Sequence, residues 1–399
     1  MRRTNTFKLR PTRGQERRLF ELADSCSRLW NEVTYKRRQT FFEGEMDWNT
    51  DEYYRRYKKP VGSATAQQVV RKSNEAWKSF FALLKQYDEG KLPPHIEKVS
   101  PPGYWKDRDS GERYLKVLVR CDSYKLDDDV LKFNKLKIKW SGKNRWQGKQ
   151  GRLEIVYDRV SGQWYAYQPV SVSPAHQPIG DKRAYVDLGV RVPVMANIEG
   201  DAETFGYSGN PLLSDWWYWT NKISECQSEL KKVNDKHKSK RLSKLYRKRR
   251  NRFRHQVNCI VKDFVERCYH RGVSEIVMGA LTGIRNNGNS MGEKSNSMVH
   301  NFWSHSYLIQ RIEEKAEEHG IRVTQVNERG TSSQCPKCGS TNIVRRGRLF
   351  KCKSCGLEAH RDAVGSVNIS IGLAHSGGEV INRAVACPLL SEAGTSHAC

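Results

Sequence analysis

The chain has 399 residues, of which 37% are hydrophobic, and this is enough to fill two or three cores. Seventy Lys and Arg against forty-four Asp and Glu give a net charge of +26, far more than solubility requires, so we expect a nucleic-acid partner. No apolar run approaches the roughly 20 residues that span a bilayer, and the charged start at Met1-Arg2-Arg3 argues against a signal peptide.

The first segments predict a strand followed by two long helices. Thr4 to Arg10 alternates like a strand, and Gly14 to Arg37 carries apolar residues at helical spacing. A second helix is expected over residues 65 to 85, with Ser63 or Thr65 as its cap.

A polar shoulder on the second helix is a candidate DNA-reading surface. Gln and Arg can read base edges through paired hydrogen bonds, and tyrosines before the helix could support them. For any one of these residues, a solvated surface role explains the sequence as well. The candidates are Tyr53, Tyr54, Gln67, Gln68 and Arg71.

Residues 114 to 172 change to a period of two, which is typical of strands. The expected strands are Tyr114 to Cys121, Val130 to Trp140, Arg152 to Tyr157 and Trp164 to Val170. Short strands in series predict a small barrel or sandwich, with the helical segment inserted after its first strand. Ser173 to Pro178 is a candidate linker.

A basic helical hairpin is predicted further along the chain. Ser214 can cap its first helix, and Lys231 to Arg254 contains thirteen Lys or Arg but one acid, Asp235. Apolar spacing resumes at Val257, so we expect a core-facing base and a charged tip. A solvated surface usually mixes both signs, and this imbalance favours phosphate contacts. The candidates are Lys244, Arg247, Lys248 and Arg250.

Two cysteine pairs predict a zinc site. Cys335 and Cys338 form one CxxC knuckle, and Cys352 and Cys355 form another, so four thiolates can surround one tetrahedral ion. Burial as small apolar residues would not explain two correctly spaced pairs, and disulfides are disfavoured because a cytosol keeps thiols reduced. A four-cysteine site is closed to substrate, so it is structural, and we expect Lys351 and Lys353 to face outward.

Two acids far apart in the sequence lie at the edges of predicted core elements. Asp187 ends a short apolar strand in YVDLG, and Asp362 begins an amphipathic segment in HRDAVGSVNI. Alone, the first could begin a turn and the second could complement a helix dipole. Together in a basic protein they suggest divalent cations between carboxylates, as in two-metal phosphodiester hydrolysis.

The order of these motifs resembles the RuvC-like half of TnpB proteins, which are transposon-encoded RNA-guided DNA nucleases. The resemblance rests on YVDLG, the basic hairpin, IVMGALTGIR, VNERGTSSQCPKCG, CKSCG and HRDAVGSVNI. Near the start, FKLRPTRGQERRLF and TAQQVVRKSNEAWKSFFALLK also resemble that family's first strand and recognition helix.

The resemblance implies an α+β multidomain fold. An RNase H-like (RuvC) α/β domain with an inserted zinc ribbon would follow a wedge β-barrel that carries a helical recognition insert. The expected ranges are 1–11 for the first wedge strand, 12–92 for the insert, 93–178 for the barrel, 179–334 for the RuvC-like domain with its hairpin at about 214–270, 335–356 for the ribbon, 357–375 for the final helix and 376–399 for a flexible tail.

One departure from the family concerns the catalytic acids. The family's second motif is an apolar strand ending in Glu-Asp-Leu, and Gly279 stands here in place of the Glu. Glu275 lies about 13 Å back along the strand, and we expect it to point away. Glu293 falls in a polar loop. Glu328 ends the next predicted strand. If the two strands are neighbours, their backbones lie about 4.8 Å apart and a Glu side chain can cross that gap, so we predict that Glu328 supplies the third carboxylate.

The implied activity is cleavage of guide-matched DNA beside a short motif, with Asp187, Glu328 and Asp362 holding two Mg²⁺. The implied partners are a guide RNA from the transposon end and double-stranded target DNA, with one protein monomer per guide and no membrane. We expect a cytoplasmic, nucleoid-associated prokaryotic protein.

If Glu328 instead pairs with an arginine, the chain would be a nuclease-dead RNA-guided binder or repressor. A DNA transposase acting without RNA is a further alternative.

Overall fold

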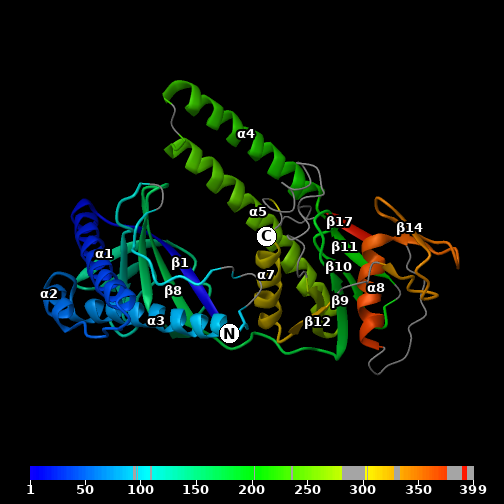
Figure 1. Cartoon of the computed structure of the whole chain (residues 1–399), viewed down its shortest axis with the longest axis horizontal. Coiled ribbons are helices and arrows are strands. Elements are labelled where there is room, and N and C mark those ends of the chain that lie inside the picture. The colour runs from blue at the N-terminus through cyan, green and yellow to red at the C-terminus, as the bar shows by residue number, and fades with distance from the viewer. Residues whose placement is uncertain are drawn as a thin grey trace. The chain divides into compact units, whose positions relative to one another are not determined.

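The computed structural model describes residues 1–92, 96, 98–107, 110–201, 203–234, 237–280, 302, 304–327, 333–374 and 389–392. The chain forms two compact units, Met1–Ser173 and Pro174–Cys399 (Figure 1). The boundary lies at the start of the predicted linker. Among the described residues, none of the helices combines the length and the hydropathy that a membrane span needs.

Three helices follow the first strand of unit one. Thr12 begins α1 with a capping box to Gln15, and apolar residues on α1 pack against the sheet. Neither predicted cap of the third helix is correct, because Gly62 occupies the N-cap and Ser63 is already helical. The polar segment with Tyr53 and Tyr54 forms a separate helix. The bounds are α1 (Arg13–Phe42), α2 (Asp51–Val61) and α3 (Ser63–Asp88).

The strands of unit one form an eight-stranded antiparallel half-barrel sheet of order β2-β7-β8-β1-β5-β4-β3, with β6 beside β8. One predicted strand, Val130 to Trp140, is two strands, because Asn134 and Lys135 both take positive φ and form a tight hairpin turn. The bounds are β1 (Arg2–Arg10), β2 (Lys116–Val119), β3 (Tyr124–Leu126), β4 (Val130–Phe133), β5 (Leu136–Gly142), β6 (Lys149–Gln150), β7 (Leu153–Asp158) and β8 (Gln163–Ser171).

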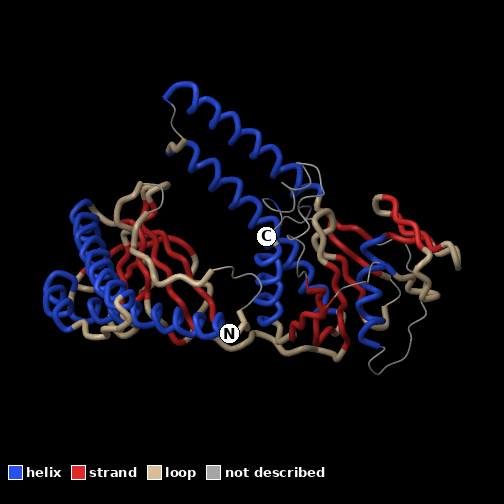
Figure 2. The backbone as a smooth tube through the Cα atoms, in the orientation of Figure 1, coloured by secondary structure: helices blue, strands red, loops and turns tan. Residues whose placement is uncertain are grey.

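Unit two contains a six-stranded mixed sheet of order β13-β12-β9-β10-β11-β17 (Figure 2). In chain order, its first three strands form an antiparallel meander, and β12 and β13 continue in parallel beyond β9. The region predicted as a tail contributes an edge strand parallel to β11. The bounds are β9 (Lys182–Asp187), β10 (Met195–Ile198), β11 (Thr204–Ser208), β12 (Val273–Ala280), β13 (Arg322–Asn327) and β17 (Leu389–Glu392).

Four helices of unit two bear on its function. The hairpin helices α4 and α5 extend away from the sheet in Figure 1, while the apolar half of α5 packs in the core. Ser239 caps α5, whereas Ser214 lies inside α4 instead of capping it. The bounds are α4 (Asn210–Asn234), α5 (Lys240–His270), α7 (His305–Glu318) and α8 (Arg361–Ala374).

A small three-stranded antiparallel sheet surrounds the cysteine pairs. Its core includes Phe350 and Cys352 and is shared with Met195 on β10 and Val364 on α8, so this sheet packs against the larger one. The bounds are β14 (Ile343–Arg346), β15 (Leu349–Cys352) and β16 (Glu358–His360).

Candidate functional site

The two predicted acids meet where β9 ends beside α8. Asp187 is the last residue of β9, and Asp362 lies in the first turn of α8 with 8% of its surface exposed. A Cβ on Gly365 would lie 2.6 Å from Oδ2 of Asp187, so the Asp187 carboxylate rests directly on the α8 backbone. Three residues of helix rise only about 4.5 Å, which brings Asp187 and Asp362 to the same turn of α8.

The Asp362 carboxylate also has a basic partner that the sequence did not suggest. Nη1 of Arg348, at the turn between β14 and β15, lies 2.7 and 2.6 Å from the two carboxylate oxygens. The small sheet therefore contributes a fixed cation to this carboxylate. Nothing in the spacing of basic residues marks Arg348, since Arg345 and Arg346 stand just before it in the sequence.

The position of the missing family Glu is level with Asp187. Met278 is in register with Val186, so Gly279 follows at the height of Asp187, and Gly279 pairs in turn with Val326 on β13. The parallel pairing of β12 with β13 meets the condition under which a Glu at the end of β13 could reach this site. Glu328 and Glu293 lie outside the described residues.

Glu275 belongs to a different part of the sheet. Glu275 is in register with Arg183 on β9 and with Arg322 on β13, four residues back along β12 from Gly279. Its carboxylate is held instead by Arg183 at 3.2 Å and Arg322 at 3.1 Å. Glu275 therefore stabilises the opposite end of these strands.

Substituting Gly365 by Ala should affect cleavage more than stability. The added Cβ would force the Asp187 carboxylate to move, while the helical backbone gains a residue of better propensity. We expect the cleavage rate to fall at least about tenfold, because displacing a catalytic group by about 1 Å can lower the rate by about 100-fold. Single-turnover cleavage and thermal unfolding provide the measurements. Gly14→Ala is the matched control, because Gly14 is also helical, in α1, and an added Cβ there would meet nothing within 4 Å. Equal losses of cleavage in the two variants would contradict this reading of Gly365.

The four predicted cysteines form one cluster. Their Sγ atoms all lie within 4.8 Å of one another, and Cys335–Cys355 and Cys338–Cys352 are each separated by 3.6 Å. A tetrahedral zinc ion with bonds of about 2.3 Å requires sulfur atoms about 3.8 Å apart, so the donors and spacing fit zinc.

The local backbone explains why the knuckles close. Gly339 and Gly356 follow each pair with φ of 71°, and their N–H groups donate to the carbonyls of Cys335 and Cys352. Backbone N–H groups, chiefly that of Cys355, lower the pKa of Cys352 to about 6, which favours the thiolate. Lys351 and Lys353 are exposed, as predicted.

The predicted DNA-reading residues are divided between two pockets in unit one. Tyr54, Gln67, Gln68 and Arg71 line a pocket of 390 Å³ between α2 and α3, together with Thr50, Asp51, Val70, Asn74 and Arg120. Tyr53 instead lines a separate pocket of 380 Å³ with Asn31, Glu32, Tyr35 and Arg56. Gln68 is buried, so the exposed shoulder consists of Gln67 and Arg71.

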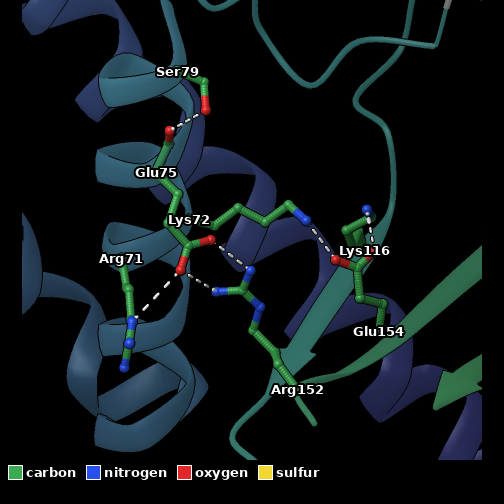
Figure 3. Close-up of polar contacts among 7 residues, drawn as sticks. All are labelled: Arg71, Lys72, Glu75, Ser79, Lys116, Arg152 and Glu154. Carbon is green, nitrogen blue, oxygen red and sulfur yellow. Dashed lines mark hydrogen bonds and ion pairs between the residues drawn. The ribbon is translucent and has the colours of Figure 1, made fainter. Parts of the chain in front are cut away.

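Ion pairs tie α3 to the sheet beside the first of these pockets (Figure 3). Glu75 on α3 accepts two hydrogen bonds from Arg152, which directly precedes β7. Glu154 on β7 lies between Lys72 and Lys116. Burial raises the pKa of Glu154, but the two lysines outweigh it and lower the pKa overall. The orientation of α3 is therefore fixed by charged pairs as well as by its apolar stripe.

The basic hairpin divides its cations between structure and surface. Arg249 on α5 stacks 3.9 Å from the ring of Trp216 on α4, so it joins the two helices. Burial lowers the pKa of Arg249. Among the predicted residues, Lys244, Lys248 and Arg250 are exposed and Arg247 is half-buried, but Lys248 already lies over the Trp219 ring. Lys244 and Arg250 are thus the best placed for phosphates.

Replacing Lys244 and Arg250 by Gln should weaken nucleic-acid binding by a similar factor for every guide sequence. Two lost phosphate contacts should also reduce the slope of log affinity against log salt by about two. Filter binding across a salt series provides the measurement. Arg241→Gln is the matched control, because Arg241 is exposed on the same helix but already paired with Glu229. An effect that varies with the guide at constant slope would indicate base reading.

Two family models match parts of the chain, almost entirely within unit two. A family model described as "Cas12f1-like, TNB domain" matches residues 305–369, and one described as "Probable transposase" (OrfB_IS605) matches residues 167–285. A Cas12f1 endodeoxyribonuclease of Syntrophomonas palmitatica is 28% identical over 266 residues, which cover 63% of this chain and 50% of that protein.

A solved structure supports the fold. The cryo-EM structure of a Cas12f1–sgRNA–target DNA complex matches with a TM-score of 0.60 at 14% identity, covering 90% of this chain and 83% of that one. At this identity, the match supports a Cas12-like multidomain α+β fold and no more.

One sequence match extends across nearly the whole chain. The TnpB-like protein ORF457 of Acidianus two-tailed virus is 35% identical over 415 residues, covering 96% of this chain and 88% of that protein. With the four-cysteine cluster and the two acids on α8 and β9, this match shows that the chain belongs to the TnpB-like protein family.

Proposed function

We propose that the chain is an RNA-guided DNA endonuclease, encoded by an insertion sequence, that cleaves guide-matched DNA beside a short adjacent motif. The observation that carries this proposal is the convergence of Asp187 and Asp362 on one turn of α8. The order β11-β10-β9-β12-β13, an antiparallel meander followed by two parallel strands, supports an RNase H-like (RuvC) domain.

The proposed catalytic residues are Asp187, Glu328 and Asp362, which would hold two Mg²⁺. When bound, such ions activate water and stabilise the leaving oxygen of a phosphodiester. The chain itself fixes Asp187 against Gly365 and Asp362 against Arg348. Glu328 comes one residue after β13 in the sequence, and β13 pairs with β12, which pairs with β9. This order of strands supports Glu328 as the third acid.

Unit one would hold the wedge and recognition functions. Its antiparallel half-barrel with inserted helices supports the wedge assignment, and the pocket between α2 and α3 would contact the adjacent DNA motif. Guide RNA would supply the sequence specificity, with the α4–α5 cations on its backbone or on the heteroduplex. The cysteine cluster would hold one structural zinc ion.

The decisive experiment starts from protein co-expressed with RNA from its own locus. The co-purified RNA should be sequenced, and a plasmid matching it should be incubated with the complex in Mg²⁺ and in EDTA. We expect guide-dependent cleavage in Mg²⁺ alone. Guide-independent cleavage, or a purified protein without RNA that joins transposon ends, would contradict the proposal and support a transposase.

A second candidate function is suggested by Gly279, which stands level with Asp187 where the family's Glu would be. The chain could then be an RNA-guided DNA-binding protein or repressor without nuclease activity. Binding of a matched target that is never cut in Mg²⁺ or Mn²⁺ would support this candidate. Asp187 and Asp362 favour the nuclease, because a binder has no use for two carboxylates facing a polyanion.

A further inference from the structure

The pocket between α2 and α3 presents the terminal nitrogens of Arg71. Among the described residues, Arg71 contacts Glu75 through Nε at 3.5 Å, and 72% of its side chain is exposed. In Figure 3 the outer end of the guanidinium points away from Glu75. The two terminal nitrogens, which form the fork that recognises paired acceptors, therefore remain available to a ligand in the pocket.

Glu75 is itself held in place by the sheet. Nη1 and Nη2 of Arg152 donate to its two oxygens at 3.2 and 2.7 Å, and only 22% of the Arg152 side chain is exposed. A carboxylate bound at both oxygens has one orientation. Glu75 can therefore direct Arg71, four residues earlier on the same helix, from a fixed point on the sheet.

Asn74 is a second hydrogen-bond donor in the pocket, and a buried arginine holds it in place. Arg37 on α1 is 1% exposed, and its Nη2 donates to Oδ1 of Asn74, while Nη1 donates to Ser73. Because Arg can only donate, Asn74 must present its oxygen to Arg37. The Nδ2 amide group of Asn74 is then left to donate on the pocket side.

The pocket also contains a carboxylate, Asp51 in the first turn of α2. A phosphate would be repelled by it, whereas the edge of a G·C pair offers both kinds of partner. Guanine carries two acceptors, O6 and N7, that match an Arg fork, and cytosine carries an amino donor that matches a carboxylate.

We propose that this pocket reads a G·C base pair from the major groove of the target-adjacent duplex, with Arg71 on guanine and with Glu75 and Arg152 as positioning residues. The inference rests on the proposed function and adds the base that the site selects. An Arg fork on guanine discriminates against other bases by roughly 5- to 150-fold.

The test uses the full chain with its co-purified RNA, in EDTA so that no cleavage occurs. Duplex DNA containing the guide-matched sequence beside a randomised block is selected for binding, and the bound pool is sequenced. We expect wild type to enrich guanine at one flanking position by about tenfold or more. Arg71→Lys, which keeps the charge but lacks the fork, should lose most of that enrichment while guide-dependent binding persists.

Glu75→Gln and Arg152→Gln should each reduce the guanine enrichment at least about threefold, because the fork is no longer oriented. Glu89→Gln is the matched control: Glu89 follows the same helix, pairs with Lys85 four residues earlier, and does not line the pocket. It should enrich guanine like wild type.

The outcomes separate the pocket from the proposed function. If wild type binds matched DNA but enriches no guanine, or if Glu75→Gln and Arg152→Gln lower binding to all flanks evenly, the inference is overturned and the proposed function stands. A uniform loss with Arg71→Lys also overturns it, since it would indicate a phosphate contact. If wild type shows no guide-dependent binding, the proposed function fails as well.

Discussion

Replacing Asp187 or Asp362 by Ala is expected to reduce DNA cleavage at least about a thousandfold while RNA-guided binding persists. Each carboxylate is a proposed metal ligand, and losing several kcal/mol of transition-state stabilisation corresponds to this factor. Binding should be unchanged or slightly tighter, because each substitution removes a negative charge that repels DNA. Cleavage of a matched plasmid and equilibrium binding in EDTA measure the two effects separately.

Glu328→Ala should behave like the aspartate variants, and Glu275→Ala is its matched control. Glu275 is held by Arg183 and Arg322, so its loss should lower stability but leave cleavage within about tenfold of wild type. Wild-type cleavage by Glu328→Ala would exclude it as the third acid. Gly279→Glu adds a further comparison, since it should restore activity only if the chain is a dead nuclease.

Cys352→Ser is expected to remove most of the bound zinc and to unfold the small sheet that surrounds it. Structural zinc contributes on the order of 10 kcal/mol to such a site, and Cys352 is completely buried. Because Arg348 on this sheet holds Asp362, cleavage should fall together with the zinc content. Metal analysis and hydrogen exchange of residues 335–360 provide the measurements.

Cys121→Ser is the control for this experiment, since Cys121 is exposed and lies in the other unit. It should retain the wild-type zinc content and exchange pattern. Well under one zinc per chain in freshly prepared wild type, or full zinc in Cys352→Ser, would contradict the assignment.

Features determined by local spacing could be predicted from the sequence. The cysteine pairs come together because each knuckle is a four-residue turn, and Asp187 ends its strand as expected, since strand and turn signals lie within a few residues. The hairpin followed from the position of its basic run between apolar segments. The sequence could pose the adjacency of β12 and β13 only as a condition, which the structure meets.

Features that depend on packing at a distance could not be predicted in this way. Arg348 reaches Asp362 because the small sheet packs on α8, a contact that leaves no periodic pattern. Tyr53 and Tyr54 are neighbours in sequence, yet the helical turn of α2 directs them to different pockets. No helix was predicted for this segment, so its residues could not be assigned to faces. The strand β17 was missed because its short run is weakly patterned.

The uninterrupted helix α5 has a mechanical consequence. Its first half carries the exposed cations and its second half lies in the core of unit two. The direction in which the cationic face points is therefore fixed relative to the core. One inserted residue would rotate that face by about 100°, whereas seven would return it almost to its original direction about 10 Å farther out. Length variation in this arm should therefore be tolerated in steps of about seven residues, with compensating change in α4.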